Sequence, residues 1–137
     1  MSKNADILLQ GTHLLENEDW DAFSRIWHPD CRITGPEGWP EPGPFEGRDA
    51  VIGQFKRLVS DFEETRFAEV EVVAERKDWV VLSFRWDVRG AGSGVAIASK
   101  MAGAYRLQDG RTIEAHFRWT PKDALEAAGL SSSSAAE

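Results

Sequence analysis

The sequence predicts an α+β fold in which helices gathered in the first half of the chain cover a curved antiparallel sheet formed by the second half. Apolar residues recur at helical spacing over about residues 4–17, 20–27 and 48–62. From about residue 67 to residue 119 the period changes to two, which is typical of half-buried strands. Helices placed ahead of a run of long strands favour a layered arrangement with the helices on one face of the sheet.

The first helix, 4–17, has a glycine on its apolar face. Gly11 is four residues from both Ile7 and Leu15, which lie on that face. A glycine inside a helix costs about 1 kcal/mol relative to alanine. Either close packing against a neighbouring element or space for a ligand would explain its presence, and the sequence leaves both explanations open.

The next elements are short and end at prolines. Asp19 is a suitable N-cap for a second helix that includes Trp27 and ends before Pro29. A strand over Cys31–Thr34 follows. The stretch 35–47 is dense in proline and glycine, so we predict a loop there and no strand. The third helix, 48–62, then has a continuous apolar stripe.

The strands are separated by turn signals. The first covers 67–75 and the second 80–89, and we predict that Gly90–Gly94 connects the second to a third strand over 95–107. The Asp109-Gly110 pair is a strong hairpin signal ahead of the last strand, 113–119.

A short helix closes the domain. Thr120 is its predicted cap, Pro121 occupies its first position and Gly129 ends it. We therefore expect one domain over 1–130, followed by a disordered, Ser/Ala-rich tail over 131–137.

Composition excludes several classes of function. The chain has 137 residues and a net charge of −7, and it contains no basic run, so we expect no nucleic-acid partner and no association with an anionic membrane. The N-terminus lacks the apolar region of a signal peptide, and the single cysteine, Cys31, forms no intrachain disulfide. We expect a cytoplasmic protein without a cofactor or a metal site.

Several separated motifs resemble the SnoaL-like family of the nuclear transport factor 2 superfamily. They are Glu18–Phe23, Trp27–Asp30, Gly43–Val51, Tyr105–Arg111 and Ala124–Leu130. The resemblance implies a ketosteroid isomerase-like cone, also described as cystatin-like, in which a curved sheet wraps around the N-terminal helices and encloses an apolar pocket. It also implies a homodimer formed through the outer face of the sheet. The superfamily contains enzymes as well as proteins with no chemistry, so it implies no single function.

The catalytic residues of ketosteroid isomerase and the hairpin histidine of the polyketide cyclases are not matched here. When the pattern of ketosteroid isomerase is laid on this chain, the tyrosine falls on Gly11, the base on Gly35 and the protonated acid on Gly103. The polyketide cyclases often have a histidine at the hairpin where this chain has Gly92. Whether the chain is an enzyme therefore stays open.

Arg85 and Asp87 resemble the Arg-x-Asp pair of limonene epoxide hydrolase, which orients water and protonates an epoxide. The third acid of that enzyme falls on Phe117. A slip of one residue in register would turn both side chains to the opposite face of the sheet. The pair is therefore either catalytic or an ion pair on the outer face.

The histidines and the single tyrosine have simple structural interpretations. His28 suits a structural hydrogen bond, and the side on which His13 lies is open. His116 alternates with Phe117, which favours an exposed position on the outer face. Tyr105 has the parity of Met101 and points inward, either as a core residue or as a donor to a ligand.

The residues expected to face the pocket are aromatic or aliphatic and almost free of ionisable groups. We predict that such a lining binds a small hydrophobic or aromatic molecule. An enzyme of the cyclase, isomerase or epoxide hydrolase type, using general acid–base catalysis, and a non-catalytic dimeric association module are the alternatives. The predicted lining comprises Ile33, Phe55, Phe84, Trp86, Val88, Met101, Tyr105, Phe117 and Trp119.

Overall fold

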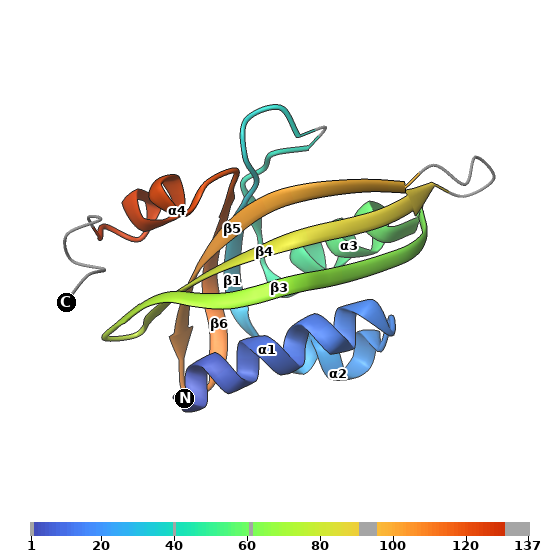
Figure 1. The fold of residues 1–137 in the computed structure, drawn as a ribbon. Coiled ribbons are helices and arrows are strands. Elements are labelled where there is room, and N and C mark those ends of the chain that lie inside the picture. The colour runs from blue at the N-terminus through green and yellow to red at the C-terminus, as the bar shows by residue number, and fades with distance from the viewer. Residues whose placement is uncertain (1, 40, 61, 91–95, 131–137) are drawn as a thin grey trace.

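A computed structural model describes residues 2–39, 41–60, 62–90 and 96–130. Most of the predicted Gly90–Gly94 connection and the whole predicted tail, 131–137, lie outside the described residues. Helices and strands are arranged as an α+β fold, as the sequence predicts (Figure 1).

Two helices, α2 and α4, begin at the predicted caps. The side chain of Asp19 accepts a hydrogen bond from the backbone N–H of Ala22, and that of Thr120 accepts one from the backbone N–H of Asp123. Both bonds satisfy N–H groups that have no partner within the helix. The helices are α1 (Lys3–Glu16), α2 (Trp20–Arg25), α3 (Arg48–Ser60) and α4 (Pro121–Ala127).

The strands form a single six-stranded sheet in the order β2-β1-β6-β5-β4-β3. The four long strands of the second half, β3 to β6, pair antiparallel, as the sequence predicts, and β1 adds a parallel pair with β6. A parallel partner distant in sequence leaves no local signal. The strands are β1 (Trp27–Thr34), β2 (Phe45–Glu46), β3 (Phe62–Arg76), β4 (Trp79–Gly90), β5 (Ala96–Gln108) and β6 (Arg111–Arg118).

Three predicted boundaries are wrong. The first strand begins at Trp27, not Cys31, because the chain pairs with β6 directly after α2. The predicted loop 35–47 contains β2, whose Phe45 lies opposite Ile33 of β1. Phe62 opens β3 and does not belong to the third helix. In each case pairing with a distant strand decides the structure, and the local spacing of apolar residues does not show that pairing.

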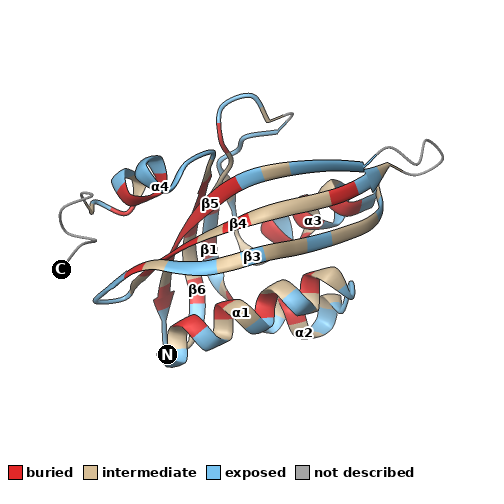
Figure 2. Ribbon diagram, in the orientation of Figure 1, coloured by how far each residue is buried: buried red, intermediate tan, exposed pale blue. Residues whose placement is uncertain are grey.

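The sheet separates two apolar clusters. Odd-numbered residues of β5, such as Met101 and Tyr105, belong to the main core with α1, α2 and α3. Even-numbered residues, such as Ala102 and Ala104, belong to a smaller cluster with Leu125 of α4. The helix α4 therefore covers part of the opposite, outer face of the sheet (Figures 1 and 2).

Candidate ligand-binding pocket

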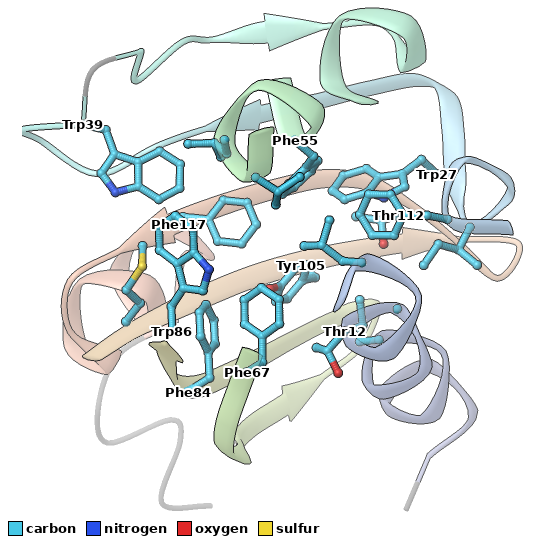
Figure 3. Close-up of a pocket in the computed structure, with 18 residues that line it drawn as sticks. Thr12, Trp27, Trp39, Phe55, Phe67, Phe84, Trp86, Tyr105, Thr112 and Phe117 are labelled. Atoms are coloured by element: carbon cyan, nitrogen blue, oxygen red, sulfur yellow. The ribbon is translucent and has the colours of Figure 1, made fainter. Parts of the chain in front are cut away.

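A pocket lies inside the main core, between the helices and the inner face of the sheet. Its cavity volume is about 70 Å³, enough for several water molecules or a small organic group. Figure 3 shows that aromatic side chains from the helices and from the strands converge on it. The lining is Leu8, Gly11, Thr12, Leu15, Phe23, Ile26, Trp27, Trp39, Phe55, Leu58, Val59, Phe67, Phe84, Trp86, Met101, Tyr105, Thr112 and Phe117.

The structure brings most of the predicted residues together here. The lining contains the predicted Phe55, Phe84, Trp86, Met101, Tyr105 and Phe117. Alternation along β4, β5 and β6 is sufficient to place all of these except Phe55, which lies on the apolar stripe of α3.

Three predicted residues lie outside the lining. Ile33 and Val88 are buried, but neither borders the cavity. Trp119 comes directly after β6, is 40% exposed, and its indole N–H donates to the backbone carbonyl of Glu37 at 2.7 Å. Its side chain therefore holds the proline-rich loop and does not border the pocket.

The residues that sequence reasoning missed come from the helices and from irregular segments. The helix α1 contributes Leu8, Thr12 and Leu15, and its apolar face was a usable signal for them. Trp39 lies in the proline-rich loop, where no period exists, and reaches the pocket by packing against Phe117, with ring centroids 6.2 Å apart.

The three glycines on which the ketosteroid isomerase pattern places catalytic residues are closely packed. A Cβ atom on Gly11 would lie 2.8 Å from Cδ1 of Ile26, and one on Gly35 would lie 2.7 Å from the ring of Trp39. A Cβ atom on Gly103 would lie 2.7 Å from the ring and the hydroxyl of Tyr105. Gly11 also borders the cavity, so both explanations for it apply: it packs closely against Ile26 and it leaves space in the pocket wall.

No charged side chain borders the cavity among the described residues. The hydroxyl of Thr12 donates within α1, to the carbonyl of Leu9 at 2.7 Å. Burial raises the pKa of Tyr105 well above that of an exposed phenol, so the side chain is neutral at physiological pH. Proton-transfer chemistry would need a group that titrates nearer neutral pH.

Two buried indole donors lack a partner. Within the described part of the chain, Nε1 of Trp27 and Nε1 of Trp86 are the buried side-chain nitrogens or oxygens without a hydrogen-bond partner. Both residues line the pocket. Unpaired donors in the wall of an apolar cavity differ from an ordinary core, where such groups are almost always paired.

Arg85 and Asp87 lie on the outer face of the sheet, because the even-numbered Phe84 and Trp86 occupy the pocket side of β4. The guanidinium of Arg85 donates to both carboxylate oxygens of Asp87, at 2.8 and 3.0 Å. This hydrogen bond lowers the pKa of Asp87. Both side chains therefore point away from the pocket. Of the two interpretations, the structure agrees with an ion pair on the outer face.

His116 is on the outer face, as predicted, but the expectation that it is exposed is wrong. The residue is 7% exposed, and its ring stacks on that of Trp79. Its Nδ1 is 2.7 Å from the hydroxyl of Thr34, and its Nε2 is 2.7 Å from a carboxylate oxygen of Glu114. These partners, Trp79, Thr34 and Glu114, come from β4, β1 and β6, and the sequence alone does not show that these strands lie together.

The other two histidines play minor roles. Nδ1 of His28 accepts from the backbone N–H of Asp30 at 3.0 Å, which is the structural hydrogen bond expected for it. His13 is exposed and lies 3.2 Å from Glu16 within α1. In the part of the chain that the structure describes, no three His, Cys, Asp or Glu side chains are grouped to hold a metal ion.

Cys31 lies in β1 and is fully buried. Burial raises the pKa of its thiol to about 11, although a backbone hydrogen bond and the charge of Arg48 act in the opposite direction. The thiol is therefore protonated and unreactive in the folded protein.

Among the described residues, none of the helices is long and apolar enough to span a bilayer.

The chain belongs to the SnoaL-like domain family, whose model matches residues 10–115. A nuclear transport factor 2-like protein of unknown function from Burkholderia pseudomallei superimposes with a TM-score of 0.76 at 20% identity, over 92% of this chain and 97% of its own. No curated protein sequence matches significantly.

Two further solved structures have the same fold. A proposed SnoaL-like polyketide cyclase from Shewanella putrefaciens has a TM-score of 0.73 at 15% identity, over 93% of this chain and 98% of its own. TerC, co-crystallised with polyporic acid, has a TM-score of 0.74 at 17% identity, over 94% and 98% of the two chains. These likenesses establish the cone fold of the nuclear transport factor 2 superfamily.

Proposed function

We propose that this protein binds a small hydrophobic or aromatic molecule in the pocket between α1, α3 and the inner face of the sheet. The observation that carries the proposal is a cavity lined by aromatic and aliphatic side chains with no charged group among the described residues. Apolar surface removed from water supplies the binding free energy, and a few polar groups orient the ligand. The co-crystal of TerC with polyporic acid supports the proposal only in showing a related fold prepared with an organic ligand.

The lining favours binding over catalysis. General acid–base catalysis needs a proton carrier at the reacting atoms. Among the described lining residues, Tyr105 is the one ionisable side chain, and its phenol is neutral. The histidine and carboxylate network around His116 lies on the other side of the sheet. The cyclase, isomerase and hydrolase alternatives therefore require groups from outside the described lining.

Intrinsic tryptophan fluorescence, titrated with toluene, cyclohexanone, hexanol and acetophenone, which suit a cavity of this size better than larger ring systems, tests the proposal. Trp27, Trp39 and Trp86 line the pocket, so an occupant will quench or shift their emission. Saturable quenching by at least one compound class is the expected result. An unchanged spectrum across the panel contradicts the proposal.

Cavity-filling variants show whether the pocket is the site. Thr12→Phe adds a ring from α1 to the cavity, and Leu58→Phe does so from α3. His13→Phe is the matched control, because it adds the same ring to the adjacent, exposed position of α1. We expect both filling variants to weaken binding at least tenfold and the control to bind like the natural protein, each with an unchanged circular dichroism spectrum.

We also propose that two copies pair through the outer face of the sheet and that the protein is cytoplasmic. The part of β4 and β5 not covered by α4 presents the Arg85–Asp87 ion pair opposite Lys100 and Ala98. Light scattering should give twice the mass of the 15.3 kDa chain. Asp87→Arg should shift the mass toward one chain, whereas Arg25→Glu, on α2, should not. A single-chain mass for the natural protein would contradict this.

A further inference from the structure

The two unpaired indole donors restrict the chemistry of the ligand more than the apolar lining does. Trp27 is only 3% exposed, and the Nε1 atoms of Trp27 and Trp86 are both buried without a partner among the described residues. Trp119, which is more exposed, has its N–H paired with the carbonyl of Glu37. Burying a donor without a partner is unfavourable, because the bond that it made to water is lost and not replaced.

The positions of the donors link them to the pocket. Both indoles border the cavity, and Figure 3 shows their rings at different ends of the lined space, with Tyr105 and Phe117 between them. The ring centroid of Trp86 lies 6.0 Å from that of Trp39 and 6.0 Å from that of Phe62. The ring centroids of Trp27 and Phe55 are 5.5 Å apart. Aromatic neighbours on several sides hold the two rings in place.

The charge of the lining restricts what can accept these hydrogen bonds. A carboxylate or phosphate in the cavity would be buried without a cation, which is strongly unfavourable. An ammonium would meet two donors and no anion. A neutral oxygen acceptor, such as a ketone, ester or ether oxygen, satisfies an indole N–H without bringing a charge into the cavity.

Resting on the function proposed above, we propose that the pocket selects neutral ring compounds that carry a carbonyl or ether oxygen, and that this oxygen accepts a hydrogen bond from the indole N–H of Trp86 or from that of Trp27. A hydrocarbon of the same shape leaves both donors unpaired. An anion of the same shape loses its hydration without gaining a cation as a partner. The two tryptophans thereby determine specificity, and the rest of the lining supplies affinity.

Three compounds of nearly equal size test the proposal by isothermal titration calorimetry at pH 7.5. Ethylbenzene has no acceptor, acetophenone has a neutral carbonyl oxygen, and benzoate has a charged acceptor. We expect acetophenone to bind about three- to tenfold more tightly than ethylbenzene, the range of one net hydrogen bond. Benzoate should bind at least tenfold more weakly than acetophenone. A benzoate affinity equal to or above that of acetophenone overturns the proposal.

Tryptophan-to-phenylalanine variants keep an aromatic ring and remove the donor. In the double variant Trp27→Phe/Trp86→Phe, the preference for acetophenone over ethylbenzene should fall to about one. Each single variant shows how much of that preference its indole provides. Trp20→Phe, outside the lining, is the matched control and should keep the full preference. A double variant that still binds ethylbenzene and retains the full preference refutes the role of the indoles.

The outcomes separate this inference from the proposed function. If none of the compounds here or in the fluorescence panel binds, the ligand-binding function itself fails. If ethylbenzene and acetophenone bind equally well, the pocket is a binding site, but the selection of an oxygen acceptor is wrong. If the double variant does not fold, as judged by circular dichroism, the two single variants decide, and an undiminished preference in both refutes the proposal.

Discussion

Replacing Gly103 with alanine should displace the ring of Tyr105. A Cβ atom at this position lies 2.7 Å from Cε2, 2.7 Å from the hydroxyl oxygen and 2.8 Å from Cζ of Tyr105. Carbon atoms in favourable contact are about 3.5–4.0 Å apart, so the ring must retreat by about 0.8 Å or more. The direction open to it is the cavity, because Tyr105 lines the pocket and meets Phe117 edge to face.

Two opposing effects set the size of the change. Overpacking of a well-filled core costs about 1–3 kcal/mol. Gly103 lies in β5 and is not one of the described glycines with positive φ, so alanine adopts its backbone without strain and gains about 0.4–1 kcal/mol from the less flexible unfolded chain. We predict a net loss of about 1–2 kcal/mol in the free energy of unfolding, together with weaker ligand binding.

Urea unfolding of a double-mutant cycle measures the effect. In a Tyr105→Ala background the clash is absent, so Gly103→Ala should cost nothing there or be slightly stabilising. Gly53→Ala in α3 is the control, because its Cβ atom meets only Arg57, at an ordinary 3.5 Å, and it should stabilise the helix by about 0.5–1 kcal/mol. If Gly103→Ala costs the same with and without the Tyr105 ring, the reasoning is refuted.

Three further predictions concern groups outside the pocket. Cys31 should react with a thiol reagent at pH 8 only when the protein is unfolded, because the thiol is fully buried and its pKa is raised to about 11; rapid modification of the folded protein would contradict this. Burial alone raises the pKa of Glu114, but the hydrogen bond from His116 and the charge of Arg106 outweigh it, so the pKa is lowered. Its contribution to stability is therefore present above about pH 4.3, the pKa of an unfolded glutamate, and is lost as the pH falls through the folded pKa. Acid unfolding curves should show this loss in the natural protein and a smaller one in Glu114→Gln, and identical curves would exclude it. Asp87→Asn should leave ligand affinity unchanged in calorimetry, since Asp87 is on the outer face; a tenfold loss would place it in the site.

The part of the fold that depends on local pattern was predictable. Period-two alternation over 80–89 and 95–107 identified β4 and β5 and assigned Phe84, Trp86, Met101 and Tyr105 to one face. The capping residues Asp19 and Thr120 act through bonds to residues three positions away, so the sequence shows them directly.

The rest depends on contacts between distant segments. The parallel pairing of β1 with β6 draws Trp27 into the sheet and brings Thr34 opposite His116. Neither the burial of His116 nor the contact of Trp39 with Phe117 follows from the residues beside them in the sequence. The role of Gly103 was equally hidden, because the Tyr105 ring folds back over a position that a family pattern marks only as an absent acid.

A methyl group inside the pocket gives the most direct test of the central claim, that this cavity binds a small hydrophobic molecule. Met101 is buried, lines the cavity, and is the only methionine after the first residue. In a protein labelled with ¹³C at the methionine methyl groups, titration with acetophenone should move the Met101 resonance progressively to saturation. The account is contradicted if acetophenone binds by calorimetry while the Met101 resonance stays in place, because the ligand then occupies another site.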